Sequence, residues 1–205
     1  MSTEFPNDLV FVPLGGTEEI GMNFNLDGLR SASHEDWIIV DLGITFGDDT
    51  MPGVEIVVPD ASFAQEKREY LHGIILTHGH EDHLGAVPYL WDQLRCPVYA
   101  TPFTAALLRK KIHENTGKSD CEIIEVPLKG KFDIGPFSVE LLSLTHSMPE
   151  PNGLAIRTDF GTIFHTGDWK FDPEPVIGEI SDSEALTKLG DEGVLACIGD
   201  STNVF

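Results

Sequence analysis

The sequence is poor in basic residues and in cysteine, and it has no long apolar run. Its 205 residues include 13 Lys and Arg against 34 Asp and Glu, a formal net charge of -21, which argues against a protein that coats nucleic acid. The three cysteines, Cys96, Cys121 and Cys197, exclude a disulfide framework and a CxxC zinc knuckle. No apolar segment approaches the length of a membrane span, and the first residues resemble neither a signal nor a transit peptide. We therefore expect a cytoplasmic protein with no membrane partner.

The composition and the short apolar runs predict a folded α/β (α+β) protein. Hydrophobic residues make up 41%, with 20 Gly and 13 Pro, which is typical of one soluble, turn-rich domain. Eight β-branched or aromatic runs predict strands: residues 37–41, 73–77, 96–100, 122–126, 137–142, 154–158, 162–165 and 194–198. Four segments predict helices: residues 61–71, 84–94, 102–115 and 183–189. For the last helix we expect Ser181 as N-cap, Glu184 as its capping-box partner and Gly190 at the end. Since strands outnumber helices, we expect sheets that are covered by helices.

The motif Thr-His-Gly-His-Glu-Asp-His-Leu-Gly at residues 77–85 places three histidines and an aspartate within six positions. Residues two apart point the same way where a strand ends, so His78 and His80 can offer ring nitrogens to one metal. Asp82 and His83 then open a helix that is expected to begin at Leu84, and they face a neighbouring position where a second metal can bind. Imidazole and carboxylate donors suit zinc or manganese, and the lack of cysteine ligands indicates a catalytic site.

Two later segments supply further candidate ligands. His146 follows the predicted strand that ends at Leu142, and Asp168 follows the predicted strand 162–165. Taken without the first motif, His146 would more often be a structural histidine, and Asp168 would more often be a turn residue. Their order and spacing after the first motif favour ligation instead.

The same motifs, with several others, resemble the bacterial ribonuclease J family, the β-CASP RNA-processing branch of the metallo-β-lactamase superfamily. The matching blocks are LGGTEEIGMN at 14–23, VDLG at 40–43, LTHGHEDHLGA at 76–86, THS at 145–147, HTGDWKFD at 165–172 and DSTN at 200–203. They occur in the family's order from about residue 9 to the last residue. The resemblance implies a four-layer αββα sandwich with a dinuclear site at one edge.

The resemblance also implies which residues bind which ion. It divides the ligands into His78, His80 and His146 for one metal, Asp82 and His83 for the other, and Asp168 as a bridge. Asp41 matches an aspartate that supports the histidine loop without binding metal. Asp82 and Asp168 are then the catalytic carboxylates, because they position the second ion and the nucleophile. His165 is expected to pack, and the cofactors are expected to be two divalent ions, Zn²⁺ or alternatively Mn²⁺.

These motifs are compatible with three functions to different degrees. Two divalent ions about 3.5 to 4 Å apart suit in-line phosphoryl displacement, and the family motifs point to a ribonuclease acting on single-stranded RNA, as a 5′-3′ exonuclease, an endonuclease or both, in RNA processing and decay. The alternative enzyme is a small-molecule hydrolase of the glyoxalase or lactonase type, since the metal motif alone does not name the substrate. A non-catalytic binding module is disfavoured, because it would be expected to lack one of the ligands.

The sequence departs from the family pattern in two places. No histidine follows His165, whereas the family takes one more ligand from beyond its inserted β-CASP domain. We therefore expect residues 1–205 to be the N-terminal part of a metallo-β-lactamase-like domain, incomplete at the C-terminus, inactive in isolation, and homo-oligomeric at full length. Residues 148–152 differ from the hydrophobic segment that usually follows the His-Ser pair in the family. Residues 101–131 carry six Lys and Arg against four acids, and we expect Lys110 and Lys111 there to form a solvated helix face more than an RNA contact.

Overall fold

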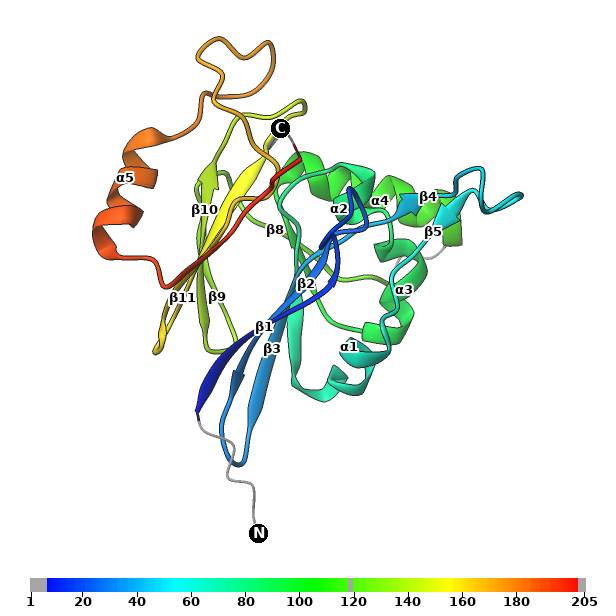
Figure 1. The fold of residues 1–205 in the computed structure, drawn as a ribbon, viewed down its shortest axis with the longest axis horizontal. Helices are drawn as coiled ribbons and strands as arrows, with labels where there is room; N and C mark the ends of the chain where they lie inside the picture. Colours follow the sequence, from blue (N-terminus) through cyan, green and yellow to red (C-terminus); the bar gives the residue numbers. More distant parts are fainter. Residues whose placement is uncertain (1–6, 118–119, 203–205) are drawn as a thin grey trace.

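Two β-sheets face each other in the structure, a computed structural model that describes residues 7–117 and 120–202 (Figure 1). The six-stranded sheet has the order β1 (Asp8–Gly15), β2 (Phe24–Arg30), β3 (Glu35–Leu42), β6 (Leu71–Ile75), β7 (Val98–Ala100) and β8 (Ile123–Glu125). The five-stranded sheet has the order β13 (Ala196–Ile198), β12 (Gly161–His165), β11 (Asn152–Thr158), β10 (Phe137–Ser143) and β9 (Lys131–Ile134). A short hairpin of β4 (Thr45–Phe46) and β5 (Ile56–Val57) projects from the body.

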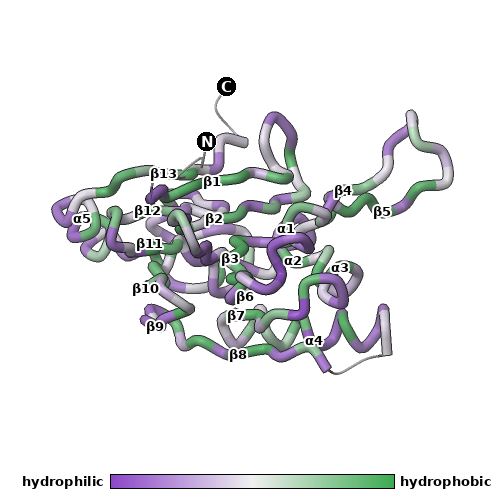
Figure 2. The backbone as a smooth tube through the Cα atoms, turned by 90° about the horizontal axis from the view of Figure 1, so that it is seen from below, coloured by the Kyte–Doolittle hydropathy of each residue, from purple (hydrophilic) through white to green (hydrophobic). Residues whose placement is uncertain are grey.

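Helices cover the outer face of each sheet, so the fold has four layers (Figure 2). The helices beside the six-stranded sheet are α1 (Ser62–Glu66), α2 (Glu81–Leu84), α3 (Val87–Leu94) and α4 (Pro102–Thr116), with a 3-10 turn at Arg68–Tyr70. One helix, α5 (Ser183–Glu192), lies on the other sheet. The predicted αββα sandwich is confirmed. Within the described residues, no helix is long and apolar enough to span a membrane.

Alternating side chains of the central strands fill the spaces between the layers. In β3, Trp37 and Ile39 face the helices, where they join a buried cluster with Leu90 of α3. Ile38 and Val40 face the five-stranded sheet and form a second buried cluster, which includes Phe137, Leu154 and Ile156. Because β3 is buried on both faces, it has the continuous apolar run expected of a strand between covered layers.

All eight predicted strands are present, with ends that shift by one or two residues. The strands that the sequence pattern missed are β1, β2, β9 and the β4–β5 hairpin. Strand β2 escapes detection because Asp27 and Gly28 interrupt its apolar alternation, although both are buried. Gly28 is needed there, since a Cβ would lie 2.4 Å from the Trp37 ring.

The predicted helix 84–94 is two helices, and its expected start at Leu84 is wrong. Helix α2 begins at Glu81, so Asp82 and His83 lie inside it, and α3 begins at Val87 after a short break. The predicted helix 61–71 is also too long, because α1 ends at Glu66 and Leu71 already belongs to β6. The compact turn at α2 brings both candidate ligands onto one side of the loop.

The predicted caps of α5 are wrong as well. Asp182 is the N-cap, and its carboxylate accepts a hydrogen bond from the Ala185 N–H at 3.0 Å. The Ser181 hydroxyl instead accepts the N–H of Thr145 at 2.9 Å, so the loop before α5 is attached beside His146. The helix runs past Gly190 to Glu192.

Candidate metal centre

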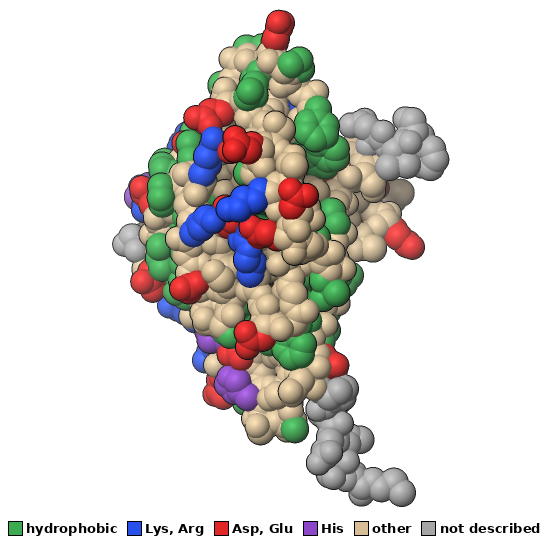
Figure 3. Space-filling view, turned by 90° about the vertical axis from the view of Figure 1, so that its left-hand side faces the viewer, with side chains coloured by type: hydrophobic (Ala, Val, Ile, Leu, Met, Phe, Trp, Pro, Cys, Tyr) green, Lys and Arg blue, Asp and Glu red, His purple; other side chains and the backbone are tan. Residues whose placement is uncertain are grey.

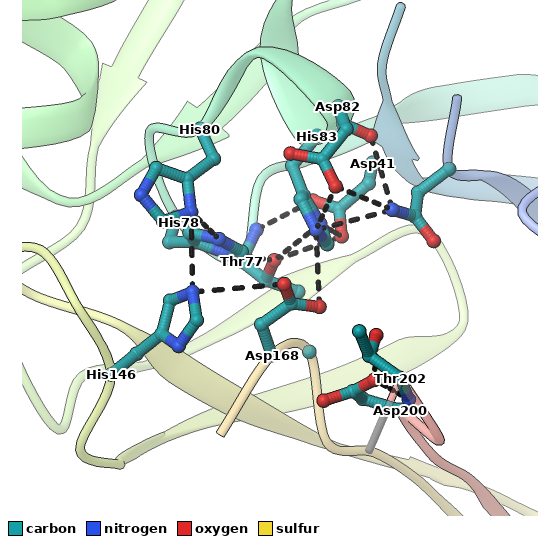
Figure 4. Close-up of polar contacts among 12 residues, drawn as sticks. Asp41, Thr77, His78, His80, Asp82, His83, His146, Asp168, Asp200 and Thr202 are labelled. Carbon is teal, nitrogen blue, oxygen red and sulfur yellow. Dashed lines mark hydrogen bonds and ion pairs between the residues drawn. The ribbon is translucent and has the colours of Figure 1, made fainter. Parts of the chain in front are cut away.

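Three histidines from two loops converge at one edge of the sandwich (Figure 4). His78 and His80 follow β6, and His146 follows β10. The Nε2 atom of His78 lies 3.1 Å from Nδ1 of His80, which lies 3.2 Å from Nε2 of His146. With an oxygen of Asp168, these nitrogens form a group whose atoms all lie within 4.8 Å of one another. We call His78, His80, His146 and Asp168 the first donor group.

Asp168 also belongs to a second donor group, which it forms with Asp82 and His83. The Nε2 atom of His83 lies 3.2 Å from Oδ1 of Asp168 and 3.4 Å from Oδ2 of Asp82. The other oxygen of Asp168, Oδ2, faces His146 at 3.6 Å. Each oxygen of one carboxylate thus faces a different group, which is the arrangement that a bridging ligand requires.

Asp41 does not belong to either donor group, but its hydrogen bonds hold the histidine loop 77–83 in place. Its carboxylate accepts the N–H and the O–H of Thr77, both at 2.8 Å, and lies 2.7 Å from Nδ1 of His83. Asp41 is buried and has a φ of 62°, a left-handed conformation that aspartate tolerates better than most residues. Such strain in a non-glycine residue is typical of functional sites.

The Thr77 hydroxyl orients His78 in turn. Since its hydrogen is donated to Asp41, its oxygen accepts from Nδ1 of His78 at 3.0 Å. The Nε2 lone pair of His78 therefore faces the other histidines, as a metal-binding tautomer requires. Asp41 holds His83 in the same way, with Nε2 toward Asp82 and Asp168.

The electrostatics of the two groups favour a bound cation. Burial, followed by the nearby imidazoles, holds the pKa of His78 well below its ordinary value, so the ring is neutral and able to bind metal. Burial alone would lower the pKa of His83, but Asp41, Asp168 and Asp82 raise it well above the ordinary value. Burial raises the pKa of Asp82 and of Asp168, but their contacts with His83 outweigh it and leave both pKa values lowered. These donors fit divalent ions, because carboxylates and imidazoles surround positions that favour positive charge.

A cavity of about 730 Å³ opens onto the second donor group. It is bounded by the loop 16–21, by residues 165–168 and by residues 198–202. Its lining includes Glu18, Glu19, Asp41, Asp82, Asp168 and Asp200, and no Lys or Arg occurs among the described residues that line it. An anionic substrate in this cavity therefore needs a cation to offset the protein's own charge.

Backbone packing keeps the histidine loop compact. A Cβ on Gly43 would lie 1.7 Å from the carbonyl oxygen of Asp82, so only glycine lets the end of β3 approach α2 this closely. The Gly79 N–H, between the first two histidines, donates to the sulfur of Met148 at 3.2 Å. Met148 is buried, and it joins the unusual segment 148–152 to the loop.

The remaining histidines lie outside both donor groups. His165 is buried, and its Nε2 lies 2.7 Å from Oδ2 of Asp27, so it joins the two sheets as a packing residue. His34 and His72 both contact Asp36, and His113 is exposed on α4. The sequence pattern gave no signal for Asp27, whose partner lies far along the chain.

The two lysines of the expected solvated face differ. Lys110 is exposed, with its Nζ 3.8 Å from Glu114. Lys111 is largely covered and pairs with Glu81 of α2, so the expectation is wrong for this residue. Lys118, one of the six basic residues in the segment 101–131, and Asn203, the last residue of the DSTN block, lie outside the described residues.

The comparisons with known proteins agree with the fold. The beta-lactamase superfamily domain matches residues 37–187. The chain is 48% identical over 198 residues to "Ribonuclease J" of Sinorhizobium meliloti, covering 97% of this chain and 35% of that protein. It is 36% identical over 206 residues to "Ribonuclease J" of Thermus thermophilus, covering 97% and 35%. The resemblance to ribonuclease J proteins is thereby confirmed, and the chain spans about a third of the length of these curated relatives.

Solved structures share the fold at low sequence identity. The metallo-beta-lactamase fold protein YhfI from Bacillus subtilis has a TM-score of 0.56 and 13% identity, covering 96% of this chain and 97% of that chain. Zn(2+)-bound PqqB from Methylobacterium extorquens has a TM-score of 0.56 and 14% identity, covering 86% and 60%.

Proposed function

The chain belongs to the β-lactamase superfamily, and on that premise we propose that its metal centre hydrolyses phosphodiester bonds in single-stranded RNA. The observation that carries the reaction type is Asp168, whose two oxygens face two separate groups of donors. The similarity to ribonuclease J proteins supports RNA as the substrate. It favours this function over the alternative of a small-molecule hydrolase.

We propose that the six donor residues bind two divalent ions. We expect Zn²⁺, with Mn²⁺ as the alternative. The assignment is His78, His80 and His146 for one ion, Asp82 and His83 for the other, and Asp168 between them. Imidazole and carboxylate donors suit both metals. Bound there, the ions would supply Lewis-acid activation of water and would neutralise charge on the phosphate.

The chain's own residues orient this chemistry. Asp41 accepts the Nδ1 proton of His83 and keeps Nε2 of that ring toward the second group. Asp82 and Asp168 have lowered pKa values, so both carry a negative charge near neutral pH and can face a bound cation. The acidic cavity lining repels phosphate groups that are not paired with a cation. Exonuclease and endonuclease action, a role in RNA processing and decay, homo-oligomerisation and a cytoplasmic location remain parts of the proposal.

A cleavage assay on the full gene product tests this function. With a 5′-monophosphorylated single-stranded RNA, we expect Asp82→Ala and Asp168→Asn to lower kcat by about 10² to 10³-fold. His113→Ala is the matched control and should cleave at the parental rate. Parental cleavage by either aspartate variant would contradict the mechanism. Hydrolysis of a thioester or lactone without RNA cleavage would favour the alternative enzyme.

A further inference from the structure

Asn23, directly before β2, reaches the second donor group from a part of the chain that is distant in sequence from the histidine motif. From these contacts we infer that Asn23 is a positioning residue, whose side-chain amide holds Asp82 and His83 in place for the second ion. The inference rests on the proposed metal centre and goes beyond it, because it adds a residue to which neither the motif nor the family resemblance assigned a role.

The contacts of Asn23 converge on these two residues. Its Nδ2 donates to the carbonyl oxygen of Asp82 at 3.2 Å and lies 3.5 Å from the Oδ2 atom of the same residue. The same Nδ2 lies 3.1 Å from Nε2 of His83. Two oxygen neighbours identify this atom of the amide as the nitrogen, because the side-chain oxygen would be repelled there. One uncharged donor group therefore touches both residues that are unique to the second group.

The backbone is built to hold this amide. The Asn23 N–H donates to the carbonyl of Asp82 at 2.9 Å, and its own carbonyl accepts the N–H of Gly43 at 2.8 Å. Met22, just before it, has a φ of 52°, a conformation that costs free energy in a non-glycine residue. A Cβ on Gly16 would lie 2.6 Å from Oδ1 of Asn23. The absence of a side chain at Gly16 thus makes the space that the carboxamide occupies.

Charge explains why an amide suits this position. Asp82 and Asp168 already bring two carboxylates to this group, so an additional carboxylate would increase repulsion, whereas a lysine would compete with the metal ion. An amide donates hydrogen bonds and adds no charge. The second group also offers three donor residues and the first offers four. The affinity of the second group therefore depends more strongly on how well its donors are held before the ion binds.

A metal titration of the full gene product tests the role of Asn23. Zn²⁺ is titrated against a chromophoric chelator, and Co²⁺ absorption is recorded in parallel. Two binding phases are expected, one for each donor group. The phase that is lost in Asp82→Ala belongs to the second group. We expect Asn23→Ala to weaken the second phase by about 10 to 100-fold and to alter its Co²⁺ spectrum. The first phase should stay at the parental affinity. Gly16→Ala keeps Asn23 but should displace its side-chain amide, so we expect it to weaken the same second phase.

Asn25→Ala is the matched control, because Asn25 lies two residues further along the chain, within β2, and lines the same cavity. It should bind both ions as the parent does. Parental affinity of Asn23→Ala in the second phase would overturn the inference. An equal loss in both phases, with a lower melting temperature of the metal-free protein, would also overturn it by showing a purely structural role. A parent that binds no metal would overturn the proposed function as well, and that outcome is visible without any variant.

Discussion

Asp41 shows how one side chain that is not a donor to either group can govern both. It contacts Thr77 twice and His83 once, and through the Thr77 hydroxyl it also fixes the tautomer of His78. Its backbone is left-handed, and asparagine tolerates that conformation as well as aspartate does. Asn is therefore the substitution that removes the charge without changing the backbone.

We expect Asp41→Asn to weaken metal binding by about 10 to 100-fold. The amide has only one acceptor oxygen, so it cannot accept from Thr77 and His83 as the carboxylate does. Equilibrium titration with Zn²⁺ measures the change. Asp36→Asn is the control, because Asp36 also lies on β3 and contacts two histidines away from the donor groups. Equal affinities in both variants would contradict the role of Asp41.

His80 is the central nitrogen of the first donor group, since its Nδ1 contacts both His78 and His146. Replacing His80 with Ala should remove the ion from this group, because it deletes the nitrogen that lies between the other two rings. Elemental analysis after dialysis should show the loss of one equivalent of metal. His113→Ala, at an exposed site on α4, should retain the parental content. Unchanged metal content in His80→Ala would exclude this group as the binding site.

The donor residues could be predicted from the sequence because each lies in a segment that comes after a strand, and the ends of neighbouring strands meet at one edge of a sandwich. Asn23 and Asp27 could not be predicted in the same way. Asn23 contacts Asp82, 59 residues away, and Asp27 contacts His165, 138 residues away. Their roles depend on the pairing of sheets, which local spacing does not encode.

At the scale of elements, the two sheets are joined by a buried polar pair within an apolar core. Asp27 of β2 and His165 of β12 have almost no exposed side-chain surface, 0% and 3%. Breaking such a pair leaves one polar group buried without its partner. We expect Asp27→Ala to lower the free energy of unfolding by about 3 to 5 kcal/mol, measured by urea denaturation.

The double variant Asp27→Leu with His165→Leu should lose less stability, since it leaves no unpaired group in the core. Asp8→Ala is the surface comparison, because Asp8 pairs with Arg30 with about a third of each side chain exposed. It should cost no more than about 1 kcal/mol. If Asp27→Ala cost no more than Asp8→Ala, the pair would not join the sheets energetically.

The extent of elements was predicted less well than their existence. Strands such as β3 and β11 have enough buried apolar residues on successive positions to be recognised. Helix α2 was misplaced because its four residues, Glu81 to Leu84, have no apolar periodicity and are held by packing against Gly43. The N-cap of α5 was misplaced by one residue, since Ser181 is engaged by Thr145 instead.

At the scale of the whole molecule, the net charge of -21 is distributed unevenly. On the face that carries α5, Lys and Arg side chains lie among Asp and Glu side chains (Figure 3). Arg157 there pairs with Glu140 and Glu192, and Lys129 pairs with Asp182. These cations are neutralised at the surface, whereas the described lining of the cavity has none.

RNA binding at the cavity should therefore require the metal ions. We expect removal of metal with a chelator to weaken the binding of a short single-stranded RNA by at least about tenfold, because the acidic lining then repels the phosphates. Fluorescence anisotropy at constant ionic strength measures the affinity, and added Zn²⁺ should restore it. Unchanged binding by the metal-free protein would show that RNA is held elsewhere.

The central claim is that this chain forms two neighbouring metal sites that share Asp168. Anomalous X-ray diffraction at the zinc absorption edge, on crystals grown with Zn²⁺, tests it most directly. We expect two peaks, one among His78, His80, His146 and Asp168, and one among Asp82, His83 and Asp168. The absence of both peaks, or peaks only at other histidines such as the His34 and His72 pair, would contradict the account.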